Sequence, residues 1–235
     1  MWQLIYPPTC VLCLDRGSNG QDICQACLDE LPRNHQACPI CAEPMPRADS
    51  CCGHCIAKRP PFDRIYAPFL YEFPLSELIG ALKFHGRLPL SRLLGEMMGD
   101  ELERMGTAQP DMLMPVPLHT KRLRQRGYNQ ALELARPLAR RFATRLDTSS
   151  CQRSGNSEAL SHLDRKHRQQ AIRGAFTLNP TFRANHVAII DDVVTTGSTV
   201  TELAKLLRKA GVGRIDVWAV ARTPDYGQPR RPVLP

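Results

Sequence analysis

Apolar positions along this chain alternate between short β-branched runs and longer segments with helical spacing. The run Val187–Ile190 is too short and too β-branched for a helix, so it predicts a buried parallel strand. A small, hydroxyl-rich turn follows this run. A helix is then predicted over about 200–210, where leucines recur at helical spacing, and it ends at Gly211. This order of strand, turn and helix is typical of an α/β unit.

The same alternation extends over most of the chain after residue 60. The further predicted elements are strands over 65–73, 111–117 and 214–222, and helices that begin after Pro74 and cover about 75–83, 88–105 and 131–142. The segment 153–173 is polar and basic with little periodicity, which predicts a long mobile loop. The proline-rich segment 223–235 predicts a loose tail. Together these elements predict an open, mostly parallel sheet flanked by helices.

Nine of the ten cysteines fall in the first 55 residues and form a different pattern. Four Cys-x2-Cys pairs can supply two tetrahedral Zn²⁺ sites. The predicted ligands are Cys10, Cys13, Cys24, Cys27, Cys38, Cys41, Cys52 and Cys55. We favour a sequential scheme, in which the first two Cys-x2-Cys pairs form one site and the last two form the other. An interleaved scheme stays open. We expect a small zinc-stabilised domain over 1–60 and a larger domain over 61–235, joined by the linker 57–61.

Hydropathy and charge narrow the class of protein further. The sequence has neither a run of about 18 apolar residues nor the layout of a signal peptide, which predicts a cytoplasmic protein without membrane insertion. In that compartment thiols stay reduced, which favours metal over disulfides. The formal net charge of +8 belongs to the second part, where 26 Lys and Arg face 17 Asp and Glu. This excess favours anionic partners, either nucleic acid or phosphorylated small molecules, and charge alone does not choose between them.

Candidate chemistry follows the strand Val187–Ile190. Asp191 and Asp192 can accept hydrogen bonds from a vicinal diol. The turn Thr195–Thr199 leads into a helix N-terminus, whose free N–H groups and dipole favour a phosphate. The pattern therefore indicates a site for a sugar with a 5′-phosphate. An ordinary strand–turn–helix of an α/β protein is the alternative.

These residues carry a family resemblance. The segment 189–199 resembles the 5-phosphoribosyl-1-pyrophosphate (PRPP) signature of type I phosphoribosyltransferases. From the N-terminal cysteines to about residue 223, the chain resembles the ComF/GntX family, bacterial proteins linked to competence and to the use of external DNA as a nutrient. The resemblance implies a Rossmann-like type I phosphoribosyltransferase fold behind a double zinc ribbon. The box Arg126–Gln130 is a family hallmark, in which we expect Gly127 to permit a turn and Asn129 to cap the following helix.

Site roles follow from the same resemblance. Asp191 and Asp192 are the catalytic candidates, since in the family this pair binds the ribose hydroxyls. The PRPP- or phosphate-binding candidates are Val193, Val194, Thr195, Thr196, Gly197, Ser198, Thr199, Lys83, Pro117, Arg126 and Arg153. Mg²⁺ is expected to accompany PRPP. Many relatives have Gln near position 160 and Asn near position 171, where this chain differs, and this leaves the acceptor open.

The implied reaction is displacement of pyrophosphate from PRPP by a nucleobase or a related nitrogen nucleophile. The alternative is a non-catalytic accessory protein that uses the fold to bind DNA phosphates or a regulatory nucleotide. Expected partners are PRPP or another sugar phosphate or nucleotide, with single-stranded DNA and competence or DNA-processing proteins as further candidates.

Overall fold

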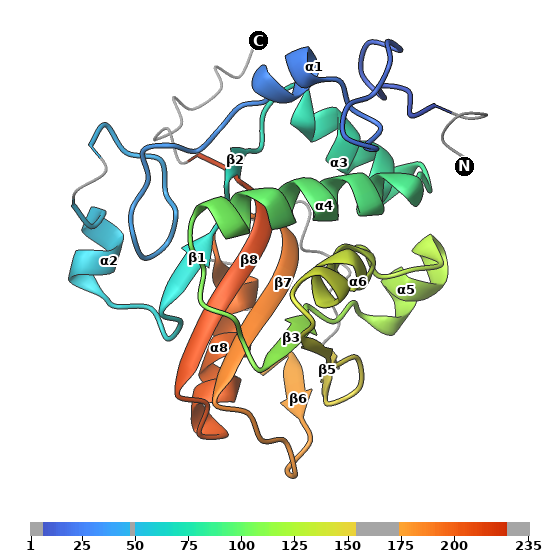
Figure 1. Cartoon of the computed structure of the whole chain (residues 1–235). Coiled ribbons are helices and arrows are strands. Elements are labelled where there is room, and N and C mark those ends of the chain that lie inside the picture. Colours follow the sequence, from blue (N-terminus) through green and yellow to red (C-terminus); the bar gives the residue numbers. More distant parts are fainter. Residues whose placement is uncertain (1–6, 48–49, 154–173, 225–235) are drawn as a thin grey trace, which may run out of the picture.

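A computed structural model describes residues 7–47, 50–153 and 174–224. Its centre is a six-stranded, parallel sheet with the order β1-β8-β7-β3-β4, in which β2 also pairs with β8 (Figure 1). The strands of this sheet are β1 Arg64–Tyr66, β2 Phe69–Leu70, β3 Met112–Pro115, β4 Arg145–Leu146, β7 His186–Val194 and β8 Arg214–Arg222. A separate antiparallel pair is formed by β5 Cys151–Arg153 and β6 Phe176–Leu178.

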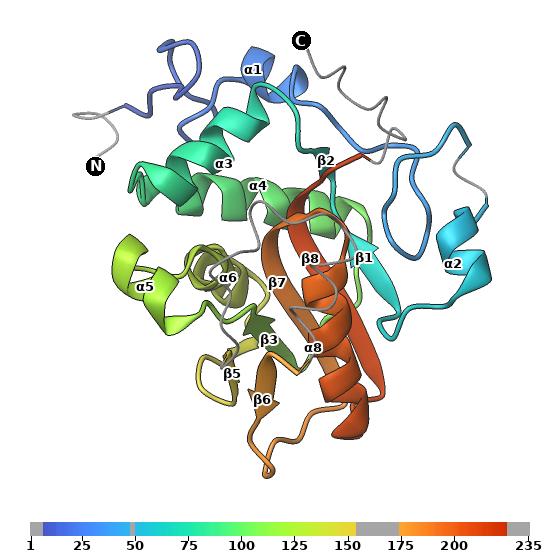
Figure 2. The same ribbon diagram turned by 180° about the vertical axis from the view of Figure 1, so that it is seen from behind.

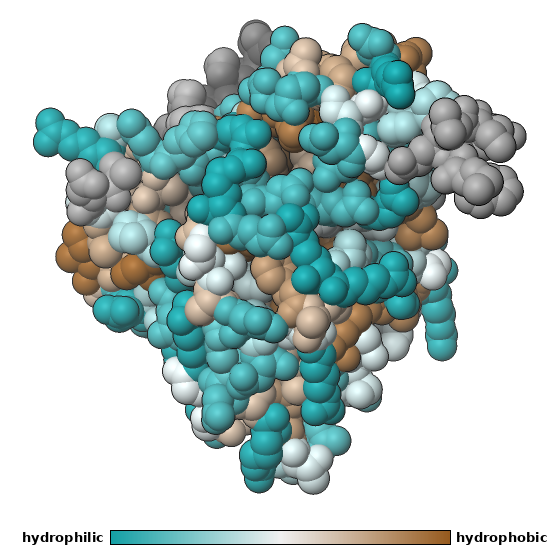
Figure 3. Space-filling model, in the orientation of Figure 1, coloured by the Kyte–Doolittle hydropathy of each residue, from teal (hydrophilic) through white to brown (hydrophobic). Residues whose placement is uncertain are grey.

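Helices cover both faces of the sheet. The helices of the described residues are α1 Gln25–Asp29, α2 Gly53–Ala57, α3 Leu75–Phe84, α4 Pro89–Arg104, α5 Thr120–Arg126, α6 Gln130–Arg141 and α8 Ser198–Lys209. Helices α3, α4 and α6 lie on one face, and α8 lies on the other, as the view from behind shows (Figure 2). Figure 3 shows hydrophilic side chains along the outer side of α4. No helix in the described ranges is both long and apolar enough to cross a membrane.

The side-chain alternation of β7 explains this layering. Ala188 and Ile190 pack into the core on the α3–α4–α6 face, whereas Val187 and Ile189 pack into the core beneath α8. All four side chains are fully buried, because both faces of the strand are covered. Trp218 of β8 is also fully buried and belongs to the first of these cores. The predicted sheet with helices on both faces is confirmed.

The structure differs from the predicted elements at several places. Strand β7 continues to Val194 because β8 is long enough to pair with it, so the two aspartates lie within the strand. The predicted strand 65–73 is split into β1 and β2 around Ala67–Pro68, and proline has no N–H for the ladder. Helix α5 was not expected. Of the predicted loop 153–173, all residues after Arg153 lie outside the described residues, as does most of the predicted tail.

The cysteine-rich region packs along the β1–β2 edge of the sheet. Backbone N–H groups of Ile65 and Leu70 donate to the carbonyls of Ile40 and Pro32, each at 2.7 Å. Ile23, which precedes α1, is 1 % exposed and joins the same core as α3 and α4. The N-terminal region therefore shares buried core and backbone hydrogen bonds with the main sheet.

Candidate functional site

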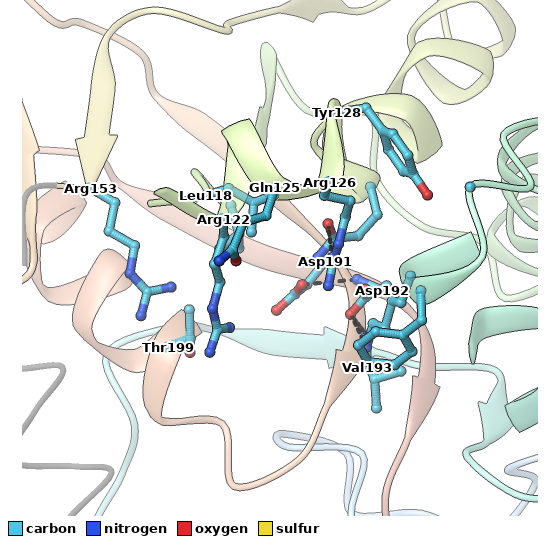
Figure 4. Close-up of a pocket in the computed structure, with 15 residues that line it drawn as sticks. Leu118, Arg122, Gln125, Arg126, Tyr128, Arg153, Asp191, Asp192, Val193 and Thr199 are labelled. Atoms are coloured by element: carbon cyan, nitrogen blue, oxygen red, sulfur yellow. Dashed lines mark hydrogen bonds and ion pairs between the residues drawn. The ribbon is translucent and has the colours of Figure 1, made fainter. Parts of the chain in front are cut away.

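A cavity of about 610 Å³ opens at the carboxyl end of β7 (Figure 4). Its walls come from the end of α3, the loop after β3, helix α5, the start of α6, the end of β5, strand β7 and the first turn of α8. The lining residues are Lys83, Phe84, Gly86, Val116, Leu118, Arg122, Gln125, Arg126, Tyr128, Gln130, Arg153, Asp191, Asp192, Val193 and Thr199. Carboxyl ends of parallel strands are where open α/β sheets bind ligands.

The paired acids lie where β7 extends beyond β3. On the side of β3, the last paired residue of β7 is Ile190, which lies opposite Pro115. Asp191 and Asp192 therefore have no β3 residue beside them, and they line the cavity. The backbone N–H of Asp192 donates to Asp191 Oδ1 at 2.9 Å, and that of Val193 donates to Asp192 Oδ1 at 2.6 Å. These bonds hold both carboxylates in fixed orientations.

The two carboxylates have different electrostatic surroundings. Asp192 is paired with Lys83, whose Nζ lies 3.0 Å from Oδ1, and its side chain is only 5 % exposed. Its second oxygen, Oδ2, is buried and has no hydrogen-bond partner in the described structure. Burial raises the pKa of Asp191 to about 7, and the negative charge of Asp192 adds to the effect, while Lys83 and Arg153 oppose it. The pair therefore offers an unsatisfied acceptor and a carboxyl that titrates near neutral pH.

Cationic side chains surround the acids. Arg126 donates to Gln130 Oε1 at 2.6 Å and lies over the Phe84 ring, with its guanidinium carbon 5.5 Å from the centroid. Figure 4 shows Arg122 and Arg153 turned toward Thr199. Burial lowers the pKa of Arg126 and of Arg153, although an arginine stays charged at neutral pH. With Lys83, these three arginines give the cavity more positive than negative charge, which suits a ligand with several phosphate oxygens.

The segment Thr195–Thr199, here called the phosphate loop, connects β7 to α8. Gly197 has a φ of 71°, a left-handed conformation that few other residues adopt, and it is the N-cap of α8. Thr196 Oγ1 and Ser198 Oγ lie 2.8 Å apart. Thr199 faces the cavity of the aspartates, where the helix N-terminus provides a positive dipole end.

The remaining residues predicted for phosphate binding are distributed around this loop. Val194, Thr196, Gly197 and Ser198 line a second cavity of about 320 Å³, between α8 and the second cysteine cluster. The carbonyl of Thr195 accepts a hydrogen bond from Arg222. Pro117 does not line the first cavity, but its neighbours Val116 and Leu118 do. Lys83, Arg126, Arg153, Val193 and both aspartates line that cavity.

Helix α5 contributes two cavity residues that the sequence analysis did not select, Arg122 and Gln125, beside the predicted Arg126. Arg122, Gln125 and Arg126 follow one another at helical spacing, so they share the face of α5 toward the cavity. That polar i, i+3, i+4 spacing was the available signal. Two predictions for this region are confirmed. Gly127 has a φ of 82° and ends α5, and Asn129 Oδ1 accepts from the N–H of Ala131 at 3.0 Å at the start of α6.

The eight predicted metal ligands form two groups in sequential order. Their sulfur atoms lie within 4.8 Å of one another in each group, which consist of Cys10, Cys13, Cys24 and Cys27, and of Cys38, Cys41, Cys52 and Cys55. The Sγ atoms of Cys41 and Cys52 are 3.5 Å apart. Tetrahedral zinc with bonds of about 2.3 Å places its sulfurs about 3.8 Å apart, so both groups are consistent with a structural Zn²⁺. Cys51 belongs to neither group, and His54 is exposed.

Comparison with known protein families assigns both parts of the chain. Residues 1–56 match the double zinc ribbon domain, and residues 129–232 match the phosphoribosyl transferase domain. The purine phosphoribosyltransferase from Pyrococcus horikoshii Ot3 overlaps with a TM-score of 0.34 at 14 % identity, covering 57 % of this chain and 78 % of that one. Because that overlap is low, the fold assignment rests on the sheet topology and the family match.

Relatives extend over most of the chain. DNA utilization protein YhgH of Escherichia coli O6:H1 (strain CFT073) is 35 % identical over 170 residues, covering 71 % of this chain and 75 % of that protein. Competence protein F of Haemophilus influenzae is 36 % identical over 172 residues, covering 70 % and 75 %. Competence protein ComFC of Streptococcus pneumoniae is 24 % identical over 156 residues, covering 66 % and 67 %. The predicted resemblance is confirmed: this chain belongs to the ComF/YhgH-like family, with an N-terminal double zinc ribbon and a phosphoribosyltransferase domain.

Proposed function

We propose that the protein binds PRPP with Mg²⁺ and transfers its phosphoribosyl group to a nitrogen nucleophile, with release of pyrophosphate. One observation carries the proposal. An acid pair, four cationic side chains and the N-terminus of α8 line the same cavity at the carboxyl end of β7. The ligand that this set fits is a pentose with hydroxyl groups on one side and phosphates at two ends.

The residues divide into three roles in this proposal. Asp191 and Asp192 accept hydrogen bonds from the ribose hydroxyls, and the unpartnered Oδ2 of Asp192 gains a donor. Thr199 and the rest of the phosphate loop, together with the preceding Val193 and Val194, hold the 5′-phosphate at the helix N-terminus. Arg126 and Lys83 share the cavity with Val116 and Leu118 of the loop after β3, where the pyrophosphate is expected. Arg122 and Arg153 face Thr199.

In the proposed reaction, the bond from ribose C1′ to the pyrophosphate oxygen breaks and a bond from C1′ to nitrogen forms. Positive charge develops on the sugar ring during this exchange, and the two carboxylates stabilise it electrostatically. The arginines stabilise the negative charge that accumulates on the departing pyrophosphate. Mg²⁺, when bound with PRPP, supplies further charge neutralisation of those oxygens.

Isothermal titration calorimetry with PRPP and Mg²⁺ tests the proposal. We expect binding by the wild type and no measurable binding by Asp191→Asn plus Asp192→Asn. The matched control is Asp100→Asn plus Glu103→Gln, which removes two carboxylates that pair with Arg141 outside the cavity. Unchanged binding by the first double variant would refute the assignment of the acid pair.

A second candidate function is the handling of nucleic acid without catalysis. It is supported by the names of the relatives, a DNA utilization protein and a competence protein, and by the net positive charge of the second part of this chain. It predicts single-stranded DNA binding that weakens steeply with salt, with a slope that reports several phosphate contacts. A flat salt response, or no binding at low salt, would count against it.

A further inference from the structure

A buried arginine connects the cysteine-rich region to the phosphate loop. Arg222, the last residue of β8, is 7 % exposed. Its Nη1 donates to the carbonyl of Val194 at 2.9 Å, to that of Thr195, and to that of Thr223 at 3.1 Å. Its Nη2 is paired with the carboxylate of Glu43. A single guanidinium therefore fixes the backbone where β7 ends and the phosphate loop begins.

The second cysteine cluster consists of Cys38, Cys41, Cys52 and Cys55. Glu43 closes the turn Cys38–Glu43, here called the knuckle, which carries the first two of these sulfurs. Its carbonyl accepts from the N–H of Cys38 at 2.8 Å, and its own N–H is hydrogen-bonded to the Cys41 sulfur. Cys38 and Cys41 are two of the four sulfurs of that cluster. The position of the Glu43 carboxylate thus depends on the conformation that the metal-binding residues impose on the knuckle.

The phosphate loop and this knuckle also share a cavity. Cys41, Glu43 and Arg222 line the space of about 320 Å³ whose opposite wall includes Thr196 and Gly197. An arginine this deeply buried needs a counter-charge, because an uncompensated charge in the interior is strongly unfavourable. If Glu43 moves, Arg222 loses that counter-charge and turns toward solvent or the open cavity. The carbonyls of Val194 and Thr195 then lose their donor.

We propose that the Glu43–Arg222 pair positions the phosphate loop, and that it couples metal occupancy of the second cysteine cluster to phosphate binding at the loop. Both are positioning residues, since neither lines the cavity of the aspartates. The ligand part of this inference rests on the proposed function, whereas the ordering of the loop does not. Coupling between two sites is reciprocal, so the bound phosphate ligand also stabilises the metal-bound knuckle.

Glu43→Gln tests the pair while it keeps the shape of the side chain. The control is Asn34→Ala, which removes hydrogen bonds from Asn34 Nδ2 to the carbonyls of Ala42 (2.9 Å) and Ala67 (3.1 Å). The bond to Ala42 holds the same turn that carries Glu43, so this control loosens the turn but leaves the Glu43–Arg222 pair in place. We expect Glu43→Gln to weaken PRPP–Mg²⁺ binding by about fivefold or more. Zinc content should stay at the wild-type value, and Asn34→Ala should keep wild-type affinity. Equal affinities of the two variants would overturn the proposal.

Hydrogen exchange keeps the test independent of PRPP. In the ligand-free protein, amides of the peptide that contains residues 195–199 should exchange faster in Glu43→Gln and in Arg222→Lys than in Asn34→Ala. Equal exchange in all three variants would overturn the proposal even if PRPP binds. If the loop exchange rises as expected but the wild type does not bind PRPP, the proposed function fails and the positioning role stands.

The reciprocal effect is measured by zinc release to a chelator. PRPP with Mg²⁺ should slow the release of zinc from the wild-type protein, and the protection should be smaller in Glu43→Gln. Equal protection of both proteins by PRPP would refute the coupling of metal occupancy to ligand binding.

Discussion

Replacing Asp191 with asparagine should make the ligand-free protein more stable while it abolishes ligand binding. The folded protein raises the pKa of this carboxyl from 3.8 to about 7, chiefly through burial and next through the charge of Asp192. Each unit of difference is worth about 1.4 kcal/mol, so ionised Asp191 costs the folded state roughly 4 kcal/mol at pH 8. Asparagine keeps the Oδ1 acceptor for the N–H of Asp192 and removes that cost.

The sign of the pH dependence follows from proton binding. Between about pH 4 and pH 7 the folded protein holds a proton on Asp191 that the unfolded chain has released. The free energy of unfolding that Asp191 contributes is therefore highest below pH 4 and falls as the pH rises through this window. We expect the stability gain of Asp191→Asn to be near zero at pH 4, to grow up to pH 7, and to stay constant above it.

Urea unfolding of the wild type and Asp191→Asn at several pH values between 4 and 8 measures this difference. The affinity for PRPP with Mg²⁺ is measured by calorimetric titration at pH 6 and pH 8. The ionised fraction of Asp191 rises from about 0.1 to about 0.9 between these values, so affinity should rise by about ninefold from this group alone. Titration in two buffers with different ionisation enthalpies should show that about half a proton is released at pH 7. A stability difference that does not change with pH would refute the reasoning.

Three further predictions concern packing, the ion pair and the metal. Gly95→Ala should cost about 1–3 kcal/mol in urea unfolding, because the added Cβ would lie 2.5 Å from Pro137 Cγ and 3.0 Å from the Leu134 carbonyl of α6. Gly80→Ala, with no atom within 4 Å, should instead be stabilising by up to about 1 kcal/mol; a similar loss in both variants would contradict this. Lys83→Met should lower the free energy of unfolding by roughly 3 kcal/mol, because it leaves buried Asp192 unpaired. Adding Asp192→Asn should recover part of this loss, and additive losses of the two variants would exclude the coupling. Cys52→Ser should lose one zinc per chain by atomic absorption, whereas neighbouring Cys51→Ser should keep both; equal metal contents would contradict the assigned ligands.

The central strands were predictable because their physical cause is local. The run 187–190 is buried on both faces, and 214–222 alternates around a fully buried Trp218, so hydrophobicity and β-branching predict both strands. The cysteine knuckles were predictable for a similar reason, since the x2 spacing itself brings two sulfurs together. The chain direction of a parallel strand then placed Asp191 and Asp192 at the carboxyl edge of the sheet.

Other parts of the candidate site depend on contacts between distant segments. Helix α5 is short and polar, with no buried residue, so no apolar periodicity indicates it. The contact of Lys83 with Asp192 joins the end of α3 to β7, and neither residue carries a local sign of the other. We expected Lys83 to face phosphate, and in the structure its Nζ lies against a carboxylate while the side chain still lines the cavity.

The position of the cysteine-rich region has a consequence that its motif does not convey. Zinc ribbons with few apolar residues are usually stabilised by metal alone, yet here Ile23 and Leu31 are 1 % and 3 % exposed within the core that also contains Leu75 and Leu94. Strands β1 and β2 meanwhile pair with β8, whose last residue, Arg222, holds the phosphate loop. At the exposed end of the region, Figure 3 shows apolar side chains at α2, where Ile56 is 73 % exposed. Unfolding of the cysteine-rich region therefore exposes the edge of the main sheet, and we expect loss of both metals to broaden the unfolding transition of the whole protein rather than to remove one independent step.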